Sequence, residues 1–505
     1  MILFINPSAR TKVYQGLGSP LAAVEPPIWA RLLASYCKQK GIEVDILDAD
    51  AANGSAAWVA EAAQEAKPML AVIVAHGQQP SASTQLMDSV IATCKAIKEL
   101  DGSVPVLIIG GHPAALPERT LEETGADAVC TGEGSVTIDQ FFKAITSGID
   151  PSVSWGNVAG LCWRAHYDER PVFTNKPAQN VYSLTEEMLG GMWELLPMDK
   201  YRAHNWHAFT NGCERKPYAS IYTSLGCPFA CLFCMIQNPF REGDKLVLKG
   251  KANSYRMWHP THVVNEIERL VTDYGVTNIK IADEMFVLNR SHVLNICQQI
   301  IERGLGDKLN MWCYARVDTL GDDALMGTMR AAGIRWVGVG IESMSEHVRD
   351  GVGKNDFTVM DIFEACRRLR KHGIHLAANF MFGLLDDTQE TMEQTLDMAF
   401  EIMPEWCNFY CTVAYPGTAL YKQVIAEGWE LPASWSGWSH YAYDYLPLRT
   451  KHLTAAEVLR FRDEAFQAYY RSPSYQSHVL TKFGPKALVE VQEMVKVPLR
   501  RKLLE

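Results

Sequence analysis

The sequence predicts two α/β units in a chain of 505 residues, followed by a mostly helical C-terminal region. Short, nearly all-apolar runs alternate with amphipathic stretches, first over residues 1–145 and again over about 219–421. This alternation is typical of parallel sheets that carry helices on their faces. We expect a doubly wound domain over residues 1–145 and a connector over 146–215. A second parallel unit should follow over 216–425, and a flap with helices over 426–505.

The composition describes a globular protein, with 48% hydrophobic and 21% charged residues. The formal net charge is −10 and Lys and Arg form no block, which argues against nucleic acid as the main partner. Thirteen cysteines are scattered singly apart from one group of three, and the opening MILFINPSA reads as a short apolar strand rather than a secretory leader. We therefore expect a reducing compartment, the cytoplasm. No stretch approaches about eighteen apolar residues, so we expect no membrane span.

The first unit alternates strand and helix five times. Its predicted strands are residues 1–6, 43–47, 70–75, 104–109 and 128–130. Its predicted helices are residues 27–40, 56–65, 84–100, 116–124 and 137–146. Doubly wound sheets bind ligands beyond the carboxyl ends of their strands, at the point where the strand order reverses.

The loops at those strand ends carry the unusual residues of the first unit. They include AHGQQPSAS over 75–83, GGHP over 110–113 and TGEGS over 131–135, where glycines let a backbone approach a bulky ligand. This order resembles the Rossmann-like cobalamin-binding domain fused to many radical S-adenosylmethionine (SAM) proteins. The resemblance implies cobalamin contacts from Asn6, Gly77, Gln78, Ser81, Ser83, Gly110, Gly111, His112, Gly132, Glu133 and Gly134.

One feature departs from the cobalamin domains whose D-x-H-x-x-G motif supplies a cobalt ligand. The first loop, NPSARTKVYQGLGSP, contains no histidine. We expect His76 and His112 to structure their loops or contact amide groups rather than to ligate cobalt. A domain that has kept the fold and lost the cofactor remains an alternative.

The connector is less periodic and contains several tryptophans and prolines, which favours packing between domains. Arg202, Trp206 and His207 lie in it and are weaker candidates for lining a cavity.

Three cysteines follow the first strand of the second unit. Cys227, Cys231 and Cys234 lie in the loop after residues 219–224, where Gly226 and Pro228 break any regular element. Three thiolates leave one corner of a four-iron, four-sulfur cube without a protein ligand, and an open iron is a binding site. A zinc site is the first alternative, but it needs a fourth ligand at short spacing, and the next histidine is His259. Simply buried thiols are the second.

The spacing C-x-x-x-C-x-x-C resembles the radical SAM superfamily. The resemblance implies a [4Fe-4S] cluster, SAM bound at its open iron, and an external one-electron reductant of the flavodoxin or ferredoxin type. It also implies that Phe233, before the third cysteine, packs against adenine.

The strands predicted for the second unit are residues 219–224, 278–282, 310–315, 335–340, 376–382 and 407–413, with helices between them. The resemblance implies that they form a partial (β/α)6 barrel, whose chemistry lies at the C-terminal strand ends. The polar residues at those ends are the expected SAM contacts: Asp283, Glu284, Arg316, Glu342 and Asn379. For each of them alone, a helix cap or a buried polar residue bonded to backbone is a competing interpretation.

Two further segments have mainly structural interpretations. Asp386, Asp387 and Thr388 open a helix and fit an N-terminal cap. The aromatic residues of segment 435–445 suggest a flap over one barrel end, or equally plain packing.

The resemblance to cobalamin-binding radical SAM proteins covers roughly residues 1–430. It implies C-methylation of an unactivated carbon of a small metabolite, through a 5′-deoxyadenosyl radical and methylcobalamin. Two alternatives remain: a cyclase or rearrangement enzyme without methyl donation, and an iron–sulfur sensing module without turnover. The sequence names neither the substrate nor a catalytic acid or base.

Overall fold

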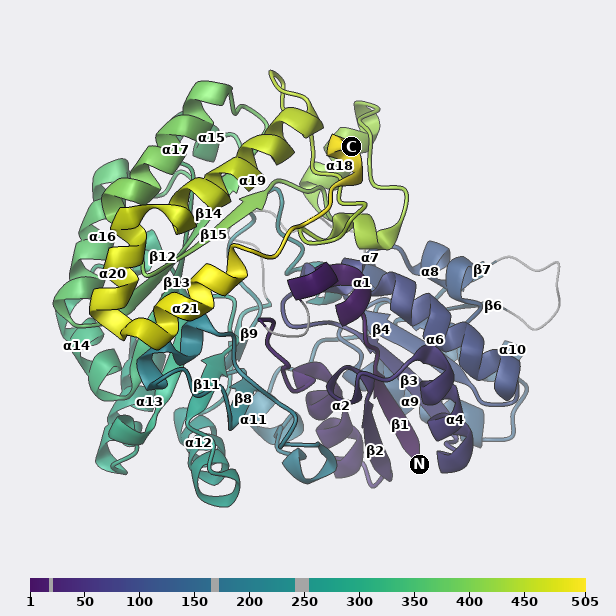
Figure 1. Cartoon of the computed structure of the whole chain (residues 1–505). Helices are drawn as coiled ribbons and strands as arrows, with labels where there is room; N and C mark the ends of the chain where they lie inside the picture. The colour runs from purple at the N-terminus through teal and green to yellow at the C-terminus, as the bar shows by residue number, and fades with distance from the viewer. Residues whose placement is uncertain (18–20, 165–171, 241–253) are drawn as a thin grey trace.

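The computed structural model describes residues 1–17, 21–164, 172–240 and 254–505. In these residues two α/β units lie side by side, and C-terminal helices cross the second unit (Figure 1). No helix in this part of the chain combines the length and the apolar character that crossing a bilayer requires.

The first unit contains the five predicted parallel strands. They are β1 (Ile2–Asn6), β2 (Val44–Asp48), β3 (Leu70–Ala75), β4 (Val106–Gly110) and β5 (Ala128–Cys130). The strand order begins β2-β1-β3-β4-β5, so the chain reverses direction across the sheet between β1 and β3. A doubly wound sheet binds its ligand at this reversal. The predicted fold of this unit is confirmed.

Helices cover both faces of this sheet, because successive side chains of a strand point to opposite faces. Ile2 and Phe4 pack in the cluster that includes α2 (Ile28–Gln39) and α9 (Ser135–Thr146). Leu3 and Ile5 pack in the cluster that includes α4 (Ala56–Ala66) and α6 (Met87–Leu100). The shorter helices of the unit are α1 (Arg10–Tyr14), α3 (Ala49–Ala52), α5 (Ala82–Gln85), α7 (Gly111–Ala115) and α8 (Pro117–Thr124).

The sheet continues beyond residue 145, which differs from the expected purely parallel sheet. Strands β6 (Leu161–Arg164) and β7 (Val172–Thr174) extend it antiparallel, so that β6 pairs with β5 and β7 with β6. These strands are only four and three residues long and β7 is largely exposed, so neither gives an apolar run long enough to predict a strand. The segment 146–215 is therefore part sheet edge and part connector, with α10 (Pro151–Ser154) and α11 (Leu184–Glu187) in it.

The second unit is the expected partial barrel of six parallel strands. In sheet order from one edge they are β15 (Trp406–Cys411), β14 (His375–Phe382), β13 (Ile334–Glu342), β12 (Asn310–Arg316), β11 (Asn278–Ile281) and β8 (Tyr218–Ile221). The connecting helices include α12 (Pro260–Tyr274), α13 (Arg290–Glu302), α14 (Asp323–Ala331), α16 (Val359–Lys371) and α17 (Gln389–Ile402). Thr388 caps α17 through a capping box, which confirms the structural interpretation of segment 386–388.

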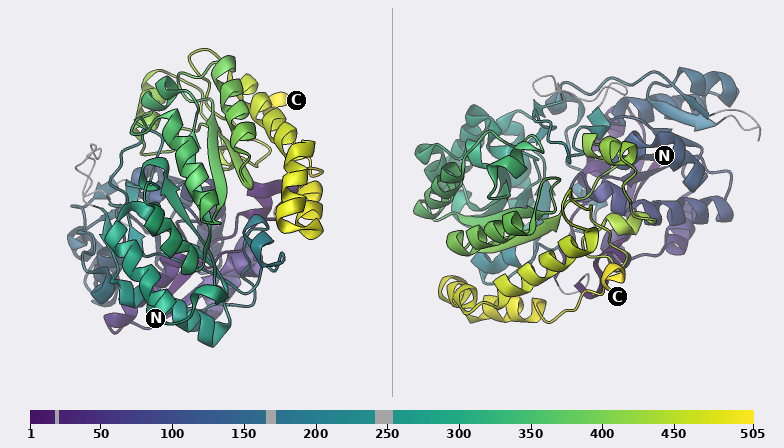
Figure 2. Two further views of the ribbon diagram at one scale, coloured as in Figure 1. Left: turned by 90° about the vertical axis from the view of Figure 1, so that its left-hand side faces the viewer. Right: turned by 90° about the horizontal axis from the view of Figure 1, so that it is seen from above.

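C-terminal helices cover the open edge of this sheet (Figure 2). They are α19 (Ala455–Arg471), α20 (Pro473–Phe483) and α21 (Pro485–Met494). Tyr470 of α19 donates its hydroxyl to the Cys407 carbonyl at 2.6 Å, and the Cys407 N–H donates back to that hydroxyl at 3.0 Å. Because β15 is an edge strand, these bonds occupy backbone groups that would otherwise have no partner strand.

Buried ion pairs join the two units. Arg256 of β10 (Arg256–Met257) lies 3.0 Å from the Glu133 carboxylate of the first unit. Lys280 of β11 lies 3.1 Å from Glu25, and both side chains are almost fully buried. Removing one partner of such a pair costs about 3–5 kcal/mol, because the other charge stays buried without compensation. These pairs hold the loops of the first sheet against the strand ends of the barrel.

Candidate active site

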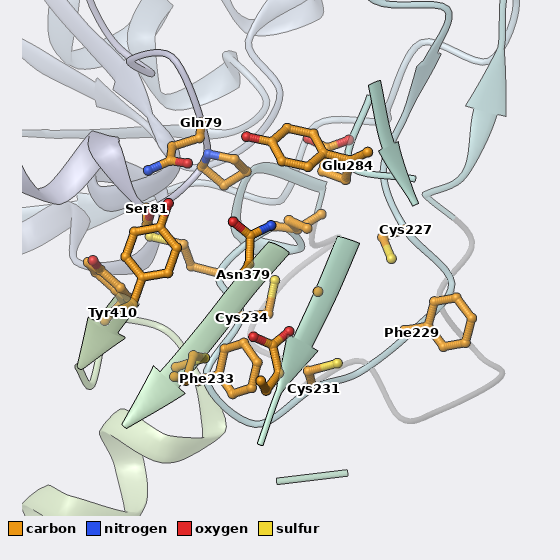
Figure 3. Close-up of a pocket in the computed structure, with 18 of the residues that line it drawn as sticks. Gln79, Ser81, Cys227, Phe229, Cys231, Phe233, Cys234, Glu284, Asn379 and Tyr410 are labelled. Atoms are coloured by element: carbon orange, nitrogen blue, oxygen red, sulfur yellow. The ribbon is translucent and has the colours of Figure 1, made fainter. Parts of the chain in front are cut away.

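A pocket of about 310 Å³ lies at the carboxyl ends of the barrel strands and receives residues from both units. Figure 3 shows Gln79 and Ser81 reaching into it from the first unit, on the side away from Cys227. Cys227, Cys231 and Cys234 line the barrel side. The pocket thus joins the two regions in which the sequence places cofactor contacts.

The cysteine loop is held in place by backbone contacts. Gly226, just before Cys227, has a φ of +81°, and a Cβ atom there would come 2.5 Å from the Ser254 carbonyl oxygen. Only glycine fits both conditions. Further along, Leu232 donates its N–H to the Val352 carbonyl at 3.2 Å.

The three thiols suit a cluster that carries its own positive charge. Burial raises the pKa of all three, that of Cys227 to about 12, so bare thiolates are unfavourable there. Among the described residues, no three His, Cys, Asp or Glu side chains are arranged to hold one metal ion. An iron–sulfur cube bound by three cysteines takes each thiolate on a different iron, so the sulfurs need not meet at one point. The donor set therefore fits a cube with one open iron.

Glu284 enters the pocket, whereas the neighbouring Asp283 does not line it. The Asp283 carboxylate accepts bonds from Thr223 and Ser224, each at 2.6 Å, and so fixes the end of β8 to β11. Asp283 therefore lies outside the pocket lining, and its contact with SAM stays a prediction. Glu284 has a buried Oε2 atom with no hydrogen-bond partner. Burial raises its pKa to about 8.

Glu284→Gln is expected to remove a pH-dependent penalty on folding of the apoprotein. A carboxyl whose pKa rises from 4.5 to about 8 on folding loses its contribution to stability as the pH rises through that interval. The variant should be more stable than the wild type by about 1–3 kcal/mol at about pH 9, and equal to it near pH 4. Thermal unfolding across this range measures the difference, with the exposed Glu302→Gln as control. Parallel curves for both proteins would contradict the altered pKa.

Arg316, Glu342 and Asn379 line the pocket as expected from their strand ends. The Arg316 guanidinium stacks 3.8 Å from the Phe229 ring centroid and pairs with two carboxylates, one of them that of Asp356 at 2.8 Å. Asn379 accepts a bond from the Asn408 amide at 2.9 Å. Together with Phe233 and Glu284, five of the six predicted SAM contacts converge on one pocket, and their roles stay predictions.

Glu342 occupies an unusual backbone position. Its φ is +65°, in the left-handed region, and the pairing of β13 with β14 shifts register between Gly340 and Glu342. The bulge turns the carboxylate toward the Lys354 ammonium, with which it forms a close ion pair. Strained backbone of this kind costs about 1–3 kcal/mol and persists where the surroundings determine it.

Several pocket residues have no counterpart among the predictions. They are mainly Gln79, Phe229, Tyr314, Lys354, Met381, Tyr410 and His440. Tyr314 precedes Arg316 by two residues, so strand alternation could have identified it as facing the same side. Lys354 and His440 come from loops, and no sequence pattern indicates that they reach the barrel.

The predicted cobalamin contacts fall into two sets: residues that line cavities or lie in the open, and residues that hold the loops together. Gln78 and Ser81 line the main pocket, and Gly77 and Gly111 line a small adjoining cavity. Asn6 lies in a separate cavity and donates its amide to Asp48 at 2.8 Å. A Cβ atom at Gly132 would meet only the Pro239 carbonyl oxygen, at 3.9 Å.

The remaining predicted cobalamin contacts hold the loops together. Ser83 donates to the Ala75 carbonyl and accepts the His112 N–H at 2.9 Å. A Cβ atom at Gly110 would come 2.1 Å from the same Ala75 oxygen, and one at Gly134 would come 1.8 Å from Ile109. Together with the ion-paired Glu133, these positions have structural roles that explain their residue types.

The two histidines on these loops are neutral and incompletely bonded. Burial lowers the pKa of His76 and of His112 to about 3. The ring centroids of His76 and Trp29 lie 4.1 Å apart in a stacked arrangement, and those of His112 and Trp435 lie 4.3 Å apart in a T-shaped one. The Nε2 atom of each is buried without a hydrogen-bond partner. The unpaired His76 nitrogen, at a residue that lines the small cavity, and the open Gly132 fit a polar, bulky ligand such as cobalamin.

The connector and the aromatic segment contribute side chains as well. Trp206 lines a second cavity in the barrel interior, whereas His207 Nε2 bonds the Asn310 carbonyl at 2.8 Å and the Arg202 Nε bonds the Ala22 carbonyl at 3.3 Å. Trp435 donates to Glu123 of the first unit at 2.6 Å, so the segment packs between the units. That segment 435–445 closes over one barrel end as a flap stays a prediction.

Comparison with known proteins identifies two domains. The family model described as the B12 binding domain matches residues 14–142, and the model of the radical SAM superfamily matches residues 221–399. An uncharacterized methyltransferase of Pyrococcus horikoshii is 26% identical over 473 residues, which cover 94% of this chain and 93% of that protein. An anaerobic magnesium-protoporphyrin IX monomethyl ester cyclase of Cereibacter sphaeroides is 26% identical over 464 residues, covering 91% of this chain and 68% of the relative.

Solved structures share the fold of the whole chain. The radical SAM methyltransferase TsrM from Kitasatospora setae, solved with cobalamin and a [4Fe-4S] cluster, superposes with a TM-score of 0.69. The match covers 98% of this chain and 99% of that one, at 18% identity. The cobalamin-dependent SAM radical enzyme OxsB superposes with a TM-score of 0.64 at 13% identity, covering 98% of this chain and 72% of OxsB. At these identities the likeness concerns the fold.

Proposed function

We propose that this chain, which belongs to the radical SAM proteins with an N-terminal B12-binding domain, is a cobalamin-dependent methyltransferase acting on an unactivated carbon of a small molecule. The observation that carries the proposal is one pocket lined both by the three-cysteine loop and by residues Gln78–Ser81 of the B12-binding domain. When bound, the cluster would cleave SAM reductively to start radical chemistry, and cobalamin would carry the methyl group.

The barrel residues offer complementary groups for SAM. In this proposal the Glu284 carboxylate accepts the ammonium group, which would give its unpartnered Oε2 a partner. The Arg316 fork faces the carboxylate, for which a guanidinium is the better geometry than an ammonium. Glu342 and Asn379 take the ribose hydroxyls, and Phe233 packs against the adenine ring. Phe229 and Met381 add apolar walls that exclude water.

The loops of the first unit would hold cobalamin opposite the cluster. Gly132 leaves room for a close backbone approach, and the Nε2 atoms of His76 and His112 offer hydrogen bonds. An external one-electron reductant completes the proposal. We also propose a cytoplasmic location, because all thirteen cysteines are free thiols.

A cyclase without methyl donation is the second candidate, because the Cereibacter sphaeroides cyclase is as similar in identity as the methyltransferase relative. Methyl transfer from SAM separates the two and needs no knowledge of the substrate. We expect cofactor-loaded protein under a strong chemical reductant to convert SAM to S-adenosylhomocysteine, up to about one per bound corrinoid, in a single turnover. Quantifying both products by chromatography measures this. Formation of 5′-deoxyadenosine without any S-adenosylhomocysteine would contradict the methyltransferase and favour the cyclase.

A further inference from the structure

A second chamber of about 180 Å³ lies in the barrel interior, and we propose that it binds a planar aromatic substrate of one or two rings bearing a carbonyl or carboxylate oxygen. The inference names the substrate class for the proposed methyltransferase and rests on that function. The chamber shares Gln78, Gln79, Tyr314, Asn379, Tyr410 and His440 with the main pocket, so a substrate held there reaches the reaction site.

Aromatic rings form much of the chamber wall. Trp312 of β12 and Trp406 of β15 face inward, and Trp206 from the connector closes the floor. The ring centroids of Trp206 and Trp312 lie 5.1 Å apart, with an angle of 70° between the ring planes. Those of Trp206 and Trp406 lie 6.2 Å apart, with an angle of 25°. Rings set at these distances and angles offer both faces and edges, which is how aromatic groups prefer to pack.

The part of the wall between Trp312 and Trp406 carries small residues, because β13 and β14 lie between β12 and β15 in the sheet. Gly338 of β13 and Ala377 of β14 are neighbours in register and both line the chamber. A Cβ atom at Gly338 would come 2.9 Å from the Tyr314 ring, so glycine lets that ring lie close to the strand. Two small residues beside three tryptophans leave room next to the rings, and we expect the rings to favour a planar molecule over a branched one.

Two residues that line the chamber carry buried donors without partners. These donors are the indole Nε1 of Trp312 and the amide Nδ2 of Asn205. Leaving a buried donor unpaired is unfavourable, so packing alone does not account for them. An oxygen atom of a bound molecule that reached either donor would give it a partner.

The charges in the chamber indicate the sign of the substrate. Among its described lining residues the charged side chains are Lys280 and Arg462, and no carboxylate lines it. Both cations pair with carboxylates that do not line the chamber: Lys280 lies 3.1 Å from Glu25, and Arg462 lies 2.8 Å from Asp463. A neutral or anionic acceptor is therefore favoured over a cation.

The size of the chamber suits a group of one or two rings. A cavity of about 150 Å³ lined by apolar side chains is known to bind benzene. The chamber is somewhat larger, at about 180 Å³, and opens toward the main pocket.

A pair of probes with equal charge tests the inference on the wild-type full chain loaded with cofactors. We expect 2-naphthoate to bind at least about tenfold more tightly than decalin-2-carboxylate, its saturated and non-planar counterpart, in equilibrium dialysis without air. Equal affinities, or no binding of either at millimolar concentration, would overturn it. Because binding is measured without turnover, this result is independent of whether S-adenosylhomocysteine forms.

A conservative variant tests the donors. Trp312→Phe keeps a ring and removes the N–H, so we expect 2-naphthoate affinity to fall about three- to tenfold while 2-methylnaphthalene, which has no oxygen, binds unchanged. Trp58→Phe, at an exposed position of α4, is the matched control and should change neither. Equal losses for both probes would show that Trp312 acts only through packing and would remove the acceptor oxygen from the inference.

Discussion

Cys234→Ser is expected to abolish reductive cleavage of SAM, with a fall of more than about 100-fold, because loss of even an outer contact of a metal site costs about 10–100-fold. The thiol lies in the main pocket between the other two cysteines of the loop and the Gln79 side. Iron content should fall with the activity. Iron analysis and 5′-deoxyadenosine quantification measure the two effects on the same preparation.

Cys297→Ala is the control for this experiment. Cys297 is also a buried free thiol, but it lies on α13 and does not line the pocket. It should keep full iron content and cleavage, with only the stability loss of a small core truncation. Retention of a full cluster in Cys234→Ser would contradict the assignment of the three ligands.

Glu133→Gln is expected to lower the free energy of unfolding by about 3–5 kcal/mol, because it leaves the buried Arg256 guanidinium without its counter-charge. Glu133 also accepts the Val181 N–H at 2.8 Å, so the carboxylate ties the first unit to both the connector and the barrel. Denaturant unfolding of the apoprotein measures the loss.

Glu122→Gln on the same unit is the matched control. Its carboxylate is exposed and lies 3.9 Å from Arg164, and such surface pairs contribute about 0–1 kcal/mol.

The sequence resemblance implied a different role for Glu133, a contact with cobalamin. Unchanged stability of Glu133→Gln together with a loss of bound corrinoid would support that role and contradict the ion-pair role.

Much of the fold follows from local sequence patterns. Several strands are short apolar runs, such as Leu70–Ala75 and Val106–Gly110, which are buried on both faces and therefore lack polar alternation. The antiparallel strands β6 and β7 escaped prediction because Val172–Thr174 is mostly exposed and forms only by pairing with its neighbour. Pairing of this kind depends on tertiary context.

The candidate site was predictable where a residue follows a strand end. Glu284, Arg316 and Asn379 reach the pocket because parallel strands place their carboxyl ends at one edge. Asp283 did not follow this rule, since a side chain one position earlier points to the other face and bonds Thr223. The partner of Glu342, Lys354, comes from a loop twelve residues later, and only the folded chain brings the two together.

The central claim is that one pocket lies between an iron–sulfur cluster and a corrinoid. The most direct test is the ultraviolet–visible spectrum of protein purified without air from cells supplied with cobalamin, recorded before and after acid release of the cofactors. We predict corrinoid absorption at about one per chain beside the broad iron–sulfur shoulder. A cluster without corrinoid would contradict the two-cofactor account and leave a radical SAM protein whose first domain has lost its ligand.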